Sequence, residues 1–315
     1  MRKYLEQVGN TPVITLSDSM FQGLNVYIKL EFNNPTGSVK DRAANFILNK
    51  LISNGEIDKD TIIIESSSGN FGIALASYCK MLGLKFFCVI DPNITETNEM
   101  LIRKLSSETF KVEHHDKYGG YLIERIKKVK QLQEQYENTY WVNQYGNPYN
   151  AEAYYRTLGC EICSEIKSID YIFVGVSSCG TITGLSQRIK EEYPNAKVIA
   201  VDIFGSVIFG GTSKKRYIPG IGSSMQPENL KNAKIDEVIQ VSEEDTIHMC
   251  NYLLENHQIF VGGSSGSVIS AIYNYFKDKK VLNINVVAIF ADRGDRYSTT
   301  IYNKKWCKEK FPNML

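Results

Sequence analysis

The stretch that decides the fold is Asn34-Pro35-Thr36-Gly37-Ser38-Val39-Lys40-Asp41-Arg42, a turn followed directly by the start of a helix. Its proline and glycine favour the turn, and Ser38 is a typical N-cap residue. Apolar residues at helical spacing follow, and Asn54-Gly55 is a typical helix stop. Lys40 is therefore predicted in the first helical turn, where the helix macrodipole disfavours a cation.

The position of Lys40 has a chemical consequence. The macrodipole, the nearby positive charge of Arg42 and any burial would all favour the neutral amine. A neutral amine is the form in which a lysine attacks a carbonyl group to form an imine. The ordinary alternative is a surface lysine in a first turn, and the segment taken alone favours that alternative.

Composition sets the class of the protein. The chain has 315 residues, of which 43% are hydrophobic, which suits one large domain or two sub-domains. The net charge of +1 argues against nucleic acid or an anionic membrane as a partner. No apolar stretch has the length of a membrane span or the form of a signal peptide, so we expect a soluble, cytoplasmic protein.

The cysteines support the same expectation. Seven cysteines are scattered along the chain, which is typical of free thiols in a reducing compartment. Cys160 and Cys163 form a C-x-x-C pattern inside a predicted helix, and no second pair lies at metal-binding spacing. We therefore predict helix packing for this pair and no metal site.

Predicted strands and helices alternate along the chain, which indicates an α/β protein with mainly parallel sheets flanked by helices. The predicted strands are 61–65, 85–90, 109–113, 140–143, 171–176, 197–202, 237–241 and 285–290. The predicted helices are 71–78, 97–105, 119–136, 151–166, 181–191, 243–255 and 267–278. A break near 144–150 predicts two sub-domains, a smaller one at 41–145 and a larger one made of 1–40 plus 146–315. The stretch 203–236 reads as a long irregular connection.

Three turns rich in glycine and serine follow predicted strands, at 66–70, 177–181 and 262–266. Such turns gather at the carboxyl ends of parallel strands, where ligands bind. Helix N-termini with small side chains bind anions. Each turn alone is weak evidence, and none matches a dinucleotide or P-loop pattern.

Together with the lysine segment, these turns resemble the motifs of the cysteine synthase and cystathionine β-synthase family. These are fold-type II enzymes, with the tryptophan synthase β-like fold, that use pyridoxal 5′-phosphate (PLP). The resemblance runs from Val8-Gly9-Asn10-Thr11-Pro12 to Asp292-Arg293-Gly294-Asp295-Arg296-Tyr297, with the motifs in the family's order. It also implies a homodimer that acts on a small amino-acid substrate.

The resemblance implies a role for each matching residue. Lys40 would form the internal aldimine with PLP. The substrate would be bound by Ser67, Ser68, Gly69, Asn70, Gln144 and Gly222, with Asn70 also reaching the ring hydroxyl of the cofactor. The cofactor phosphate would be bound by Ser177, Ser178, Cys179, Gly180 and Thr181, and Ser264 would meet the pyridine nitrogen. Further candidate substrate contacts are Phe71, Arg216 and Asn232.

The implied chemistry is β-replacement. A neutral serine at the pyridine nitrogen makes the ring a milder electron sink than an aspartate would. Lys40 would remove the substrate α-proton as general base. A group then leaves Cβ, which gives an α-aminoacrylate, and a nucleophile adds at Cβ.

Several positions depart from the pattern of plain cysteine synthases. Ser177 and Cys179 stand where those enzymes carry glycines, and their side chains would crowd the phosphate or add a hydroxyl donor. Phe71 replaces a threonine beside the substrate. Lys214-Lys215-Arg216 reads either as a solvated run or as a group that attracts an anionic substrate.

The resemblance leaves the second substrate open. Gly119-Gly120-Tyr121-Leu122 and Tyr140-Trp141-Val142-Asn143-Gln144-Tyr145 resemble two groups of enzymes. One group releases hydrogen sulfide from L-cysteine, with water (giving L-serine) or a thiol as acceptor, and this is our first hypothesis. The other joins O-phosphoserine to L-glutamate in diaminopropionate formation. An inactive PLP-binding regulatory subunit is a third alternative. If water is the acceptor, Glu228, Asn232 and Asp236 are the polar candidates to orient or activate it.

Overall fold

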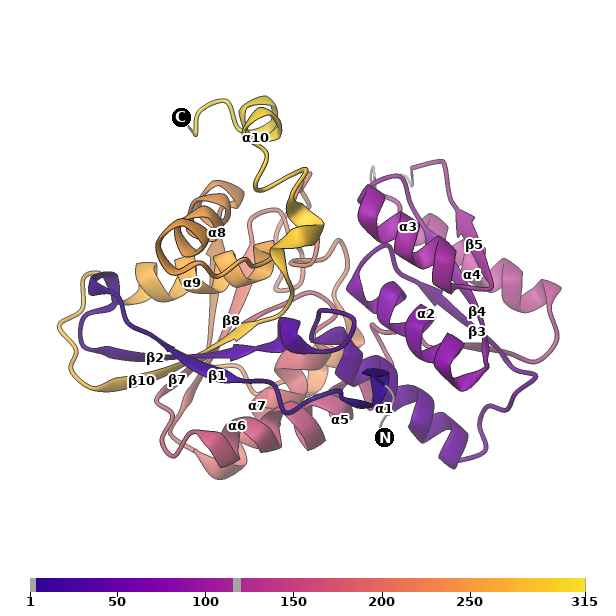
Figure 1. Cartoon of the computed structure of the whole chain (residues 1–315), viewed down its shortest axis with the longest axis horizontal. Coiled ribbons are helices and arrows are strands. Elements are labelled where there is room, and N and C mark those ends of the chain that lie inside the picture. The colour runs from indigo at the N-terminus through magenta and orange to yellow at the C-terminus, as the bar shows by residue number, and fades with distance from the viewer. Residues whose placement is uncertain (1–3, 116–119, 315) are drawn as a thin grey trace.

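The computed structural model describes residues 4–115 and 120–314 and shows two lobes, each built on a sheet with helices packed against it (Figure 1). The larger sheet has six strands in the order β1-β2-β10-β7-β8-β9. They are β1 (Val13–Leu16), β2 (Leu24–Leu30), β7 (Tyr171–Gly175), β8 (Lys197–Ile203), β9 (Glu237–Val241) and β10 (Ile284–Phe290). All neighbours pair in parallel except β1 with β2. The α/β fold with mainly parallel sheets is confirmed.

Sequence patterning did not identify β1 and β2. β2 contains Lys29, whose side chain is fully buried. A buried lysine disguises the apolar pattern of a strand, and it is tolerated here because its Nζ pairs with Glu165 at 2.8 Å and with Glu161 at 3.1 Å.

The smaller sheet has four parallel strands in the order β5-β4-β3-β6. They are β3 (Ile62–Ser66), β4 (Lys85–Ile90), β5 (Glu108–Lys111) and β6 (Thr139–Trp141). Each lies within one or two residues of its predicted position. All four fall inside the segment predicted as the smaller sub-domain, 41–145, whose boundaries stay a prediction.

The helices α2 (Asn70–Leu82), α3 (Glu96–Leu105) and α4 (Leu122–Gln135) accompany the smaller sheet (Figure 1). The predicted start of α4 at 119 lies outside the described residues. α1 (Lys40–Ser53) packs against α2 on one side and against α5 (Pro148–Tyr154) of the larger lobe on the other. The helix that Lys40 begins therefore lies between the two lobes.

The larger lobe contains the remaining helices. The predicted helix at 151–166 is interrupted: α5 leads into a π-helical turn, η4 (Tyr155–Gly159), and then α6 (Cys160–Glu165). The others are α7 (Gly180–Glu192), α8 (Glu243–His257), α9 (Gly263–Phe276) and α10 (Lys304–Lys310). Within the described residues, no helix is long and apolar enough to cross a membrane.

α9 begins four residues before its predicted start, so the predicted turn at 262–266 is largely the first turn of the helix. Glycine has a low helix propensity, which is why the sequence favoured a turn. Tertiary packing overrides that preference, because a side chain at Gly263 would collide with Ile218 and one at Gly266 with Cys250.

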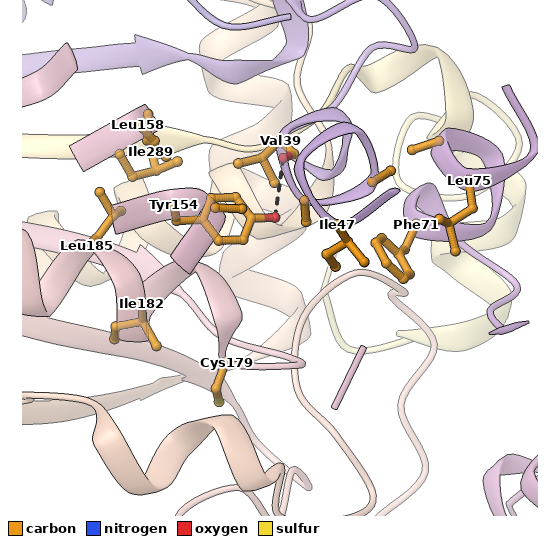
Figure 2. Packing of buried hydrophobic residues seen from close by; sticks show 14 of the residues in the cluster. Val39, Ile47, Phe71, Leu75, Tyr154, Leu158, Cys179, Ile182, Leu185 and Ile289 are labelled. Atoms are coloured by element: carbon orange, nitrogen blue, oxygen red, sulfur yellow. Dashed lines mark hydrogen bonds between the residues drawn. The ribbon is translucent and has the colours of Figure 1, made fainter. Parts of the chain in front are cut away.

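The long connection between β8 and β9 is confirmed as mostly irregular, with one short 3₁₀ turn, η5 (Glu228–Asn232). The largest apolar cluster crosses both lobes and contains residues of α1, α2, α5 and α7 (Figure 2). This shared core holds the helix that begins with Lys40 against both lobes.

Candidate active site

Lys40 is the first residue of α1, and Asp41 holds the turn before it. The Asp41 carboxylate accepts hydrogen bonds from Thr36 N at 3.0 Å, Thr36 Oγ1 at 2.7 Å and Tyr78 Oη at 3.0 Å. An acid in the first turn also complements the macrodipole. Ser38 lies one residue before the cap position, so the N-cap prediction is wrong, although its Oγ accepts from Lys40 N at 3.3 Å.

The environment of Lys40 favours the neutral amine. Burial lowers the pKa of the Lys40 amine to about 8, although Asp292 and Cys179 partly raise it. At pH 7, roughly a tenth of such lysines are neutral. The prediction that the charge of Arg42 favours the neutral amine of Lys40 is wrong, because the Arg42 guanidinium pairs with Glu31 and Glu161.

Tyr154 lies under the Lys40 amine and was not anticipated from the sequence. Its ring centroid is 5.9 Å from Lys40 Nζ, and its Oη donates to Val39 O at 3.2 Å (Figure 2). The Tyr154 hydroxyl also interacts with the Thr181 side chain, and burial raises its pKa so that it stays protonated. Tyr154 thus connects the start of α1 with the 177–181 turn.

The 177–181 turn leads from the end of β7 into α7. Cys179 precedes the helix in the left-handed conformation, with φ 61°, and its side chain packs in the core cluster with Ile182 (Figure 2). A side chain at Gly180 would collide with Asn150. The first N–H groups of α7 therefore begin at a closely packed glycine, an arrangement suited to binding a phosphate-like anion.

The 177–181 turn is joined to the long connection through Gly222. Ser177 Oγ donates to Gly222 O at 3.1 Å, and Gly222 N donates to Val176 O at 2.7 Å. Ser178 and Thr181 are buried. The structure therefore brings Gly222 beside the predicted phosphate-binding residues, and the Ser177 hydroxyl is already used within the protein.

The hydroxyls of Ser67 and Ser68 in the 66–70 turn are also used within the protein. Ser67 Oγ accepts from Gly72 N at 3.0 Å, at the start of α2. Ser68 Oγ donates to Asp91 Oδ2 at 3.0 Å and accepts from Arg125 Nη1 at 3.2 Å. These bonds fix the backbone, so the groups best suited to an anion are the first N–H groups of α2.

Asn70 contacts Asp292 and Arg296, and Tyr297 binds the same carboxylate of Asp292. The sequence analysis assigned no role to these three residues. Asn70 Nδ2 donates to Asp292 Oδ2 at 2.7 Å, and Tyr297 Oη donates to the same oxygen at 2.6 Å. Arg296 donates to Asn70 Oδ1 and to Thr36 O. Asp292 lies two residues after the end of β10, at the carboxyl end of the strand like the predicted turns, and that position was the available signal.

Ser264 is the second residue of α9 and is buried. A Cβ at Gly175, the last residue of β7, would lie 3.5 Å from Ser264 Cβ. Ser264 is therefore next to the strand end that leads into the 177–181 turn. The structure brings this predicted cofactor contact to the same end of the sheet as the predicted phosphate-binding residues.

Gln144 is held by two asparagines that also contact the 177–181 turn. Its main-chain carbonyl oxygen accepts hydrogen bonds from Asn150 Nδ2 at 2.6 Å and from Asn229 Nδ2 at 2.8 Å. Asn229 Nδ2 also donates to Ser178 O at 3.0 Å. The sequence analysis named the neighbours of Asn229 in the long connection but missed Asn229 itself.

Two of the weaker sequence candidates, Phe71 and Asn232, make contacts outside the turns described above. Phe71 is 2% exposed and packs in the apolar cluster near Ile47 (Figure 2). Asn232 O accepts from Gln187 Nε2, in the middle of α7. The substrate contacts expected of Phe71 and Asn232 stay predictions.

The other two candidates for activating water are Asp236 and Glu228. Asp236 pairs with Lys190 of α7 at 2.8 Å and accepts from Val198 N. A side chain at Gly146 would lie 3.0 Å from Glu228 Oε2. In residues 4–115 and 120–314, no group of three or more potential ligands is arranged to hold a metal ion.

The chain is similar to known proteins over almost its whole length. The model of the pyridoxal-phosphate dependent enzyme family matches residues 4–292. The O-acetylserine dependent cystathionine β-synthase from Helicobacter pylori has a solved structure that is 30% identical, with a TM-score of 0.87 over 95% of this chain and 98% of that one.

Two further solved structures are hydrogen sulfide-producing enzymes. One, from Fusobacterium nucleatum (Fn1220), is 27% identical with a TM-score of 0.86 and covers 94% of this chain and 99% of its own. The other (Fn1055, D232N mutant), in complex with an α-aminoacrylate intermediate, is 32% identical with a TM-score of 0.86 and covers 94% of this chain and 90% of its own. The similarity thus covers both lobes and all the turns described above.

Proposed function

The chain belongs to the family of pyridoxal-phosphate dependent enzymes, and we propose that it carries out β-replacement at Cβ of L-cysteine, releasing hydrogen sulfide with water or a thiol as acceptor. The observation that carries the proposal is the position of Lys40. Burial lowers the pKa of its amine to about 8, and the amine lies over the ring of Tyr154, whose hydroxyl also interacts with Thr181 at the N-terminus of α7.

The described residues fit PLP. The N-terminus of α7 begins at a glycine too closely packed for any side chain, which suits a phosphate group. The buried Ser264 hydroxyl at the end of β7 suits the pyridine nitrogen, and the Asp292 Oδ1 atom is buried without a partner among the described residues. When bound, PLP supplies the electron sink that makes the α-proton of an amino acid acidic.

We assign proton transfer to Lys40. A general base works best when its pKa lies near the working pH, and burial places the Lys40 amine there. Tyr154 keeps the amine in place by binding Val39 O, directly before the lysine. The Lys40 amine would take the proton from Cα, and the leaving thiolate would take a proton as it departs from Cβ.

We assign the substrate carboxylate to the N-terminus of α2. The N–H groups there and the macrodipole favour an anion. Ser67 and Ser68 position this backbone through their bonds to Gly72 and Asp91. The main chain of Gln144 is fixed by Asn150 and Asn229, and its side-chain amide, which donates to Ser66 O at 3.4 Å, would complete the carboxylate site.

The choice of L-cysteine as substrate is supported by the two sulfide-producing enzymes in the comparison. We extend the family likeness to a homodimer in the cytoplasm, which analytical ultracentrifugation and cell fractionation test.

The direct test uses purified protein loaded with PLP, L-cysteine as the only substrate, and the Lys40→Ala variant as the matched control. We expect sulfide together with L-serine, if water is the acceptor, or lanthionine, if a second cysteine is. Lys40→Ala should release none above background. Turnover of O-phosphoserine with L-glutamate and no sulfide would replace this proposal with the alternative substrates. No turnover of either, with PLP bound, would indicate a regulatory subunit.

A further inference from the structure

Arg216 lies in the connection between β8 and η5, close to both lobes. Gly222 touches Arg216: a side chain at Gly222 would collide with Arg216 Nη1. Gly222 is itself bonded to Ser177 and Val176 at the end of β7. On the other side, the charge of Arg216 acts on Tyr145, which follows Gln144 in the smaller lobe. Arg216 is thus beside Gly222 and the end of β7, where the 177–181 turn of the proposed site begins.

The guanidinium of Arg216 is only partly satisfied. Its Nη2 donates to Ser224 Oγ at 2.9 Å. Its Nη1 is buried and has no hydrogen-bond partner among the described residues. Leaving a buried charged donor unpaired is unfavourable, so such a donor is expected where a ligand supplies the acceptor.

Nearby acids leave Arg216 Nη1 without that acceptor. Glu243 is the acceptor for Tyr217 N at 2.7 Å and Ile218 N at 2.6 Å. Asp202 acts on Arg216 only through its charge, and Asp202 Oδ2 is itself buried without a partner among the described residues. Among the described residues, Arg216 Nη1 is therefore left without an acceptor, although two acids lie near the guanidinium.

We propose that Arg216 binds the carboxylate of the incoming nucleophile, so that the preferred acceptor is a thiol that carries a carboxylate. This inference rests on the proposed function. The first substrate's carboxylate is already assigned to the N-terminus of α2 in the smaller lobe, whereas Arg216 belongs to the larger lobe beside Gly222. A second anion site beside Gly222 therefore serves a second amino acid.

The reaction balances with two molecules of L-cysteine. The C–S bond at Cβ of the first breaks, and its sulfur leaves as hydrogen sulfide. The thiol of the second loses its proton, which the leaving sulfide takes up, and forms the new C–S bond at the same Cβ. The product is lanthionine, and no oxidant or reductant is consumed.

The test compares two acceptors that differ only in charge, mercaptopropionate and mercaptopropanol, at saturating L-cysteine. For the wild type we expect kcat/KM to favour mercaptopropionate by about tenfold or more, because a bond to a charged donor is worth about 1.5–3 kcal/mol. Arg216→Gln should lose this preference, with a much larger fall in kcat/KM for mercaptopropionate than for mercaptopropanol, and Arg216→Lys should restore part of it. An equal loss with both acceptors would show a merely structural role and overturn the proposal, as would an unchanged preference.

A binding measurement decides the question even if no sulfide is released. Methylthiopropionate carries the carboxylate but has no reactive thiol, and its affinity for the PLP-loaded protein is measured by calorimetry. We expect Arg216→Gln to weaken its binding about tenfold or more, with no change for methylthiopropanol. Equal affinities in wild type and variant would overturn the assignment of Arg216. Absence of sulfide would overturn only the proposed function.

Discussion

Two arginines, the buried Arg42 and the half-buried Arg216, differ in how completely the protein satisfies them. Each of the three side-chain nitrogens of Arg42 donates to a carboxylate oxygen of Glu31 or Glu161, at 2.6 to 2.8 Å. Arg216 has one hydrogen bond, to Ser224, and a buried Nη1 without a partner among the described residues. A guanidinium that the fold satisfies fully serves structure, whereas a half-satisfied one beside a site is available to a ligand.

The surroundings of the two arginines support this distinction. Arg42 joins α1 to β2's end and to α6, and Glu31 is fully buried with it. Thr11 Oγ1 donates to Glu31 Oε1 at 2.6 Å, which completes the network. Arg42 therefore holds α1, and with it Lys40, against the larger lobe.

The largest expected effect is on stability. Arg42→Met leaves the buried Glu31 without its partner and should lower the free energy of unfolding by about 3–5 kcal/mol. Arg216→Met removes one hydrogen bond and an unsatisfied donor, so we expect a loss of about 1 kcal/mol or less. Guanidinium chloride unfolding of both variants measures the difference. Equal losses would remove the distinction between the two arginines.

The second largest effect is on the stability of the fold at acidic pH. Burial tends to raise the pKa of the Glu161 carboxyl, but its hydrogen bonds to Arg42 and the charge of Arg42 lower that pKa from 4.5 to about 2. A carboxyl with a lowered pKa stabilises the fold at a pH above its unfolded value and loses that contribution as the pH falls through its folded value. This difference corresponds to about 3 kcal/mol.

We therefore expect the stability difference between wild type and Glu161→Gln to be full above pH 4.5 and to shrink as the pH falls towards 2. Urea unfolding across this range measures it. Glu152→Gln is the control, since its partner Arg156 is exposed and the pair should contribute less than about 1 kcal/mol at any pH. A constant difference for Glu161→Gln across the range would contradict the role given to Arg42.

The smallest effect tests the contact that positions Lys40. Tyr154→Phe keeps the ring but removes the hydrogen bond to Val39 O, which should cost about 1 kcal/mol of stability. We also expect slower capture of PLP by the apo-protein, because Lys40 is less well placed. The pH profile of capture should still rise through about 8, the pKa of the Lys40 amine. A shifted profile would show that Tyr154 sets the pKa of that amine and not only its position.

Much of the site could be predicted from the sequence because its signals are local. The turn before Lys40, the helix end at Asn54 and the turns at 66–70 and 177–181 follow from glycine, proline and serine chemistry at short range. The predicted start of α9 is four residues too late, because its glycines pack against Ile218 and Cys250, and no local sequence pattern reveals these contacts.

The remainder depends on contacts between distant parts of the chain. Asn70 and Asp292 are 222 residues apart, and Arg42 and Glu161 are 119 apart. Whether a serine hydroxyl is free for a substrate, as expected of Ser68, or already bonded to Asp91 is likewise decided only by folding. The unsatisfied Nη1 of Arg216 is a property of packing and leaves no mark in the sequence.

The central claim is that Lys40 carries the cofactor, and reduction of the PLP-loaded protein with borohydride tests it most directly. Borohydride fixes PLP to the lysine that holds it, and mass spectrometry of a digest then identifies the modified peptide. We predict a pyridoxyl group on the peptide that contains Lys40, and an unmodified digest for Lys40→Ala. A pyridoxyl group on another lysine in the wild-type protein would contradict the account.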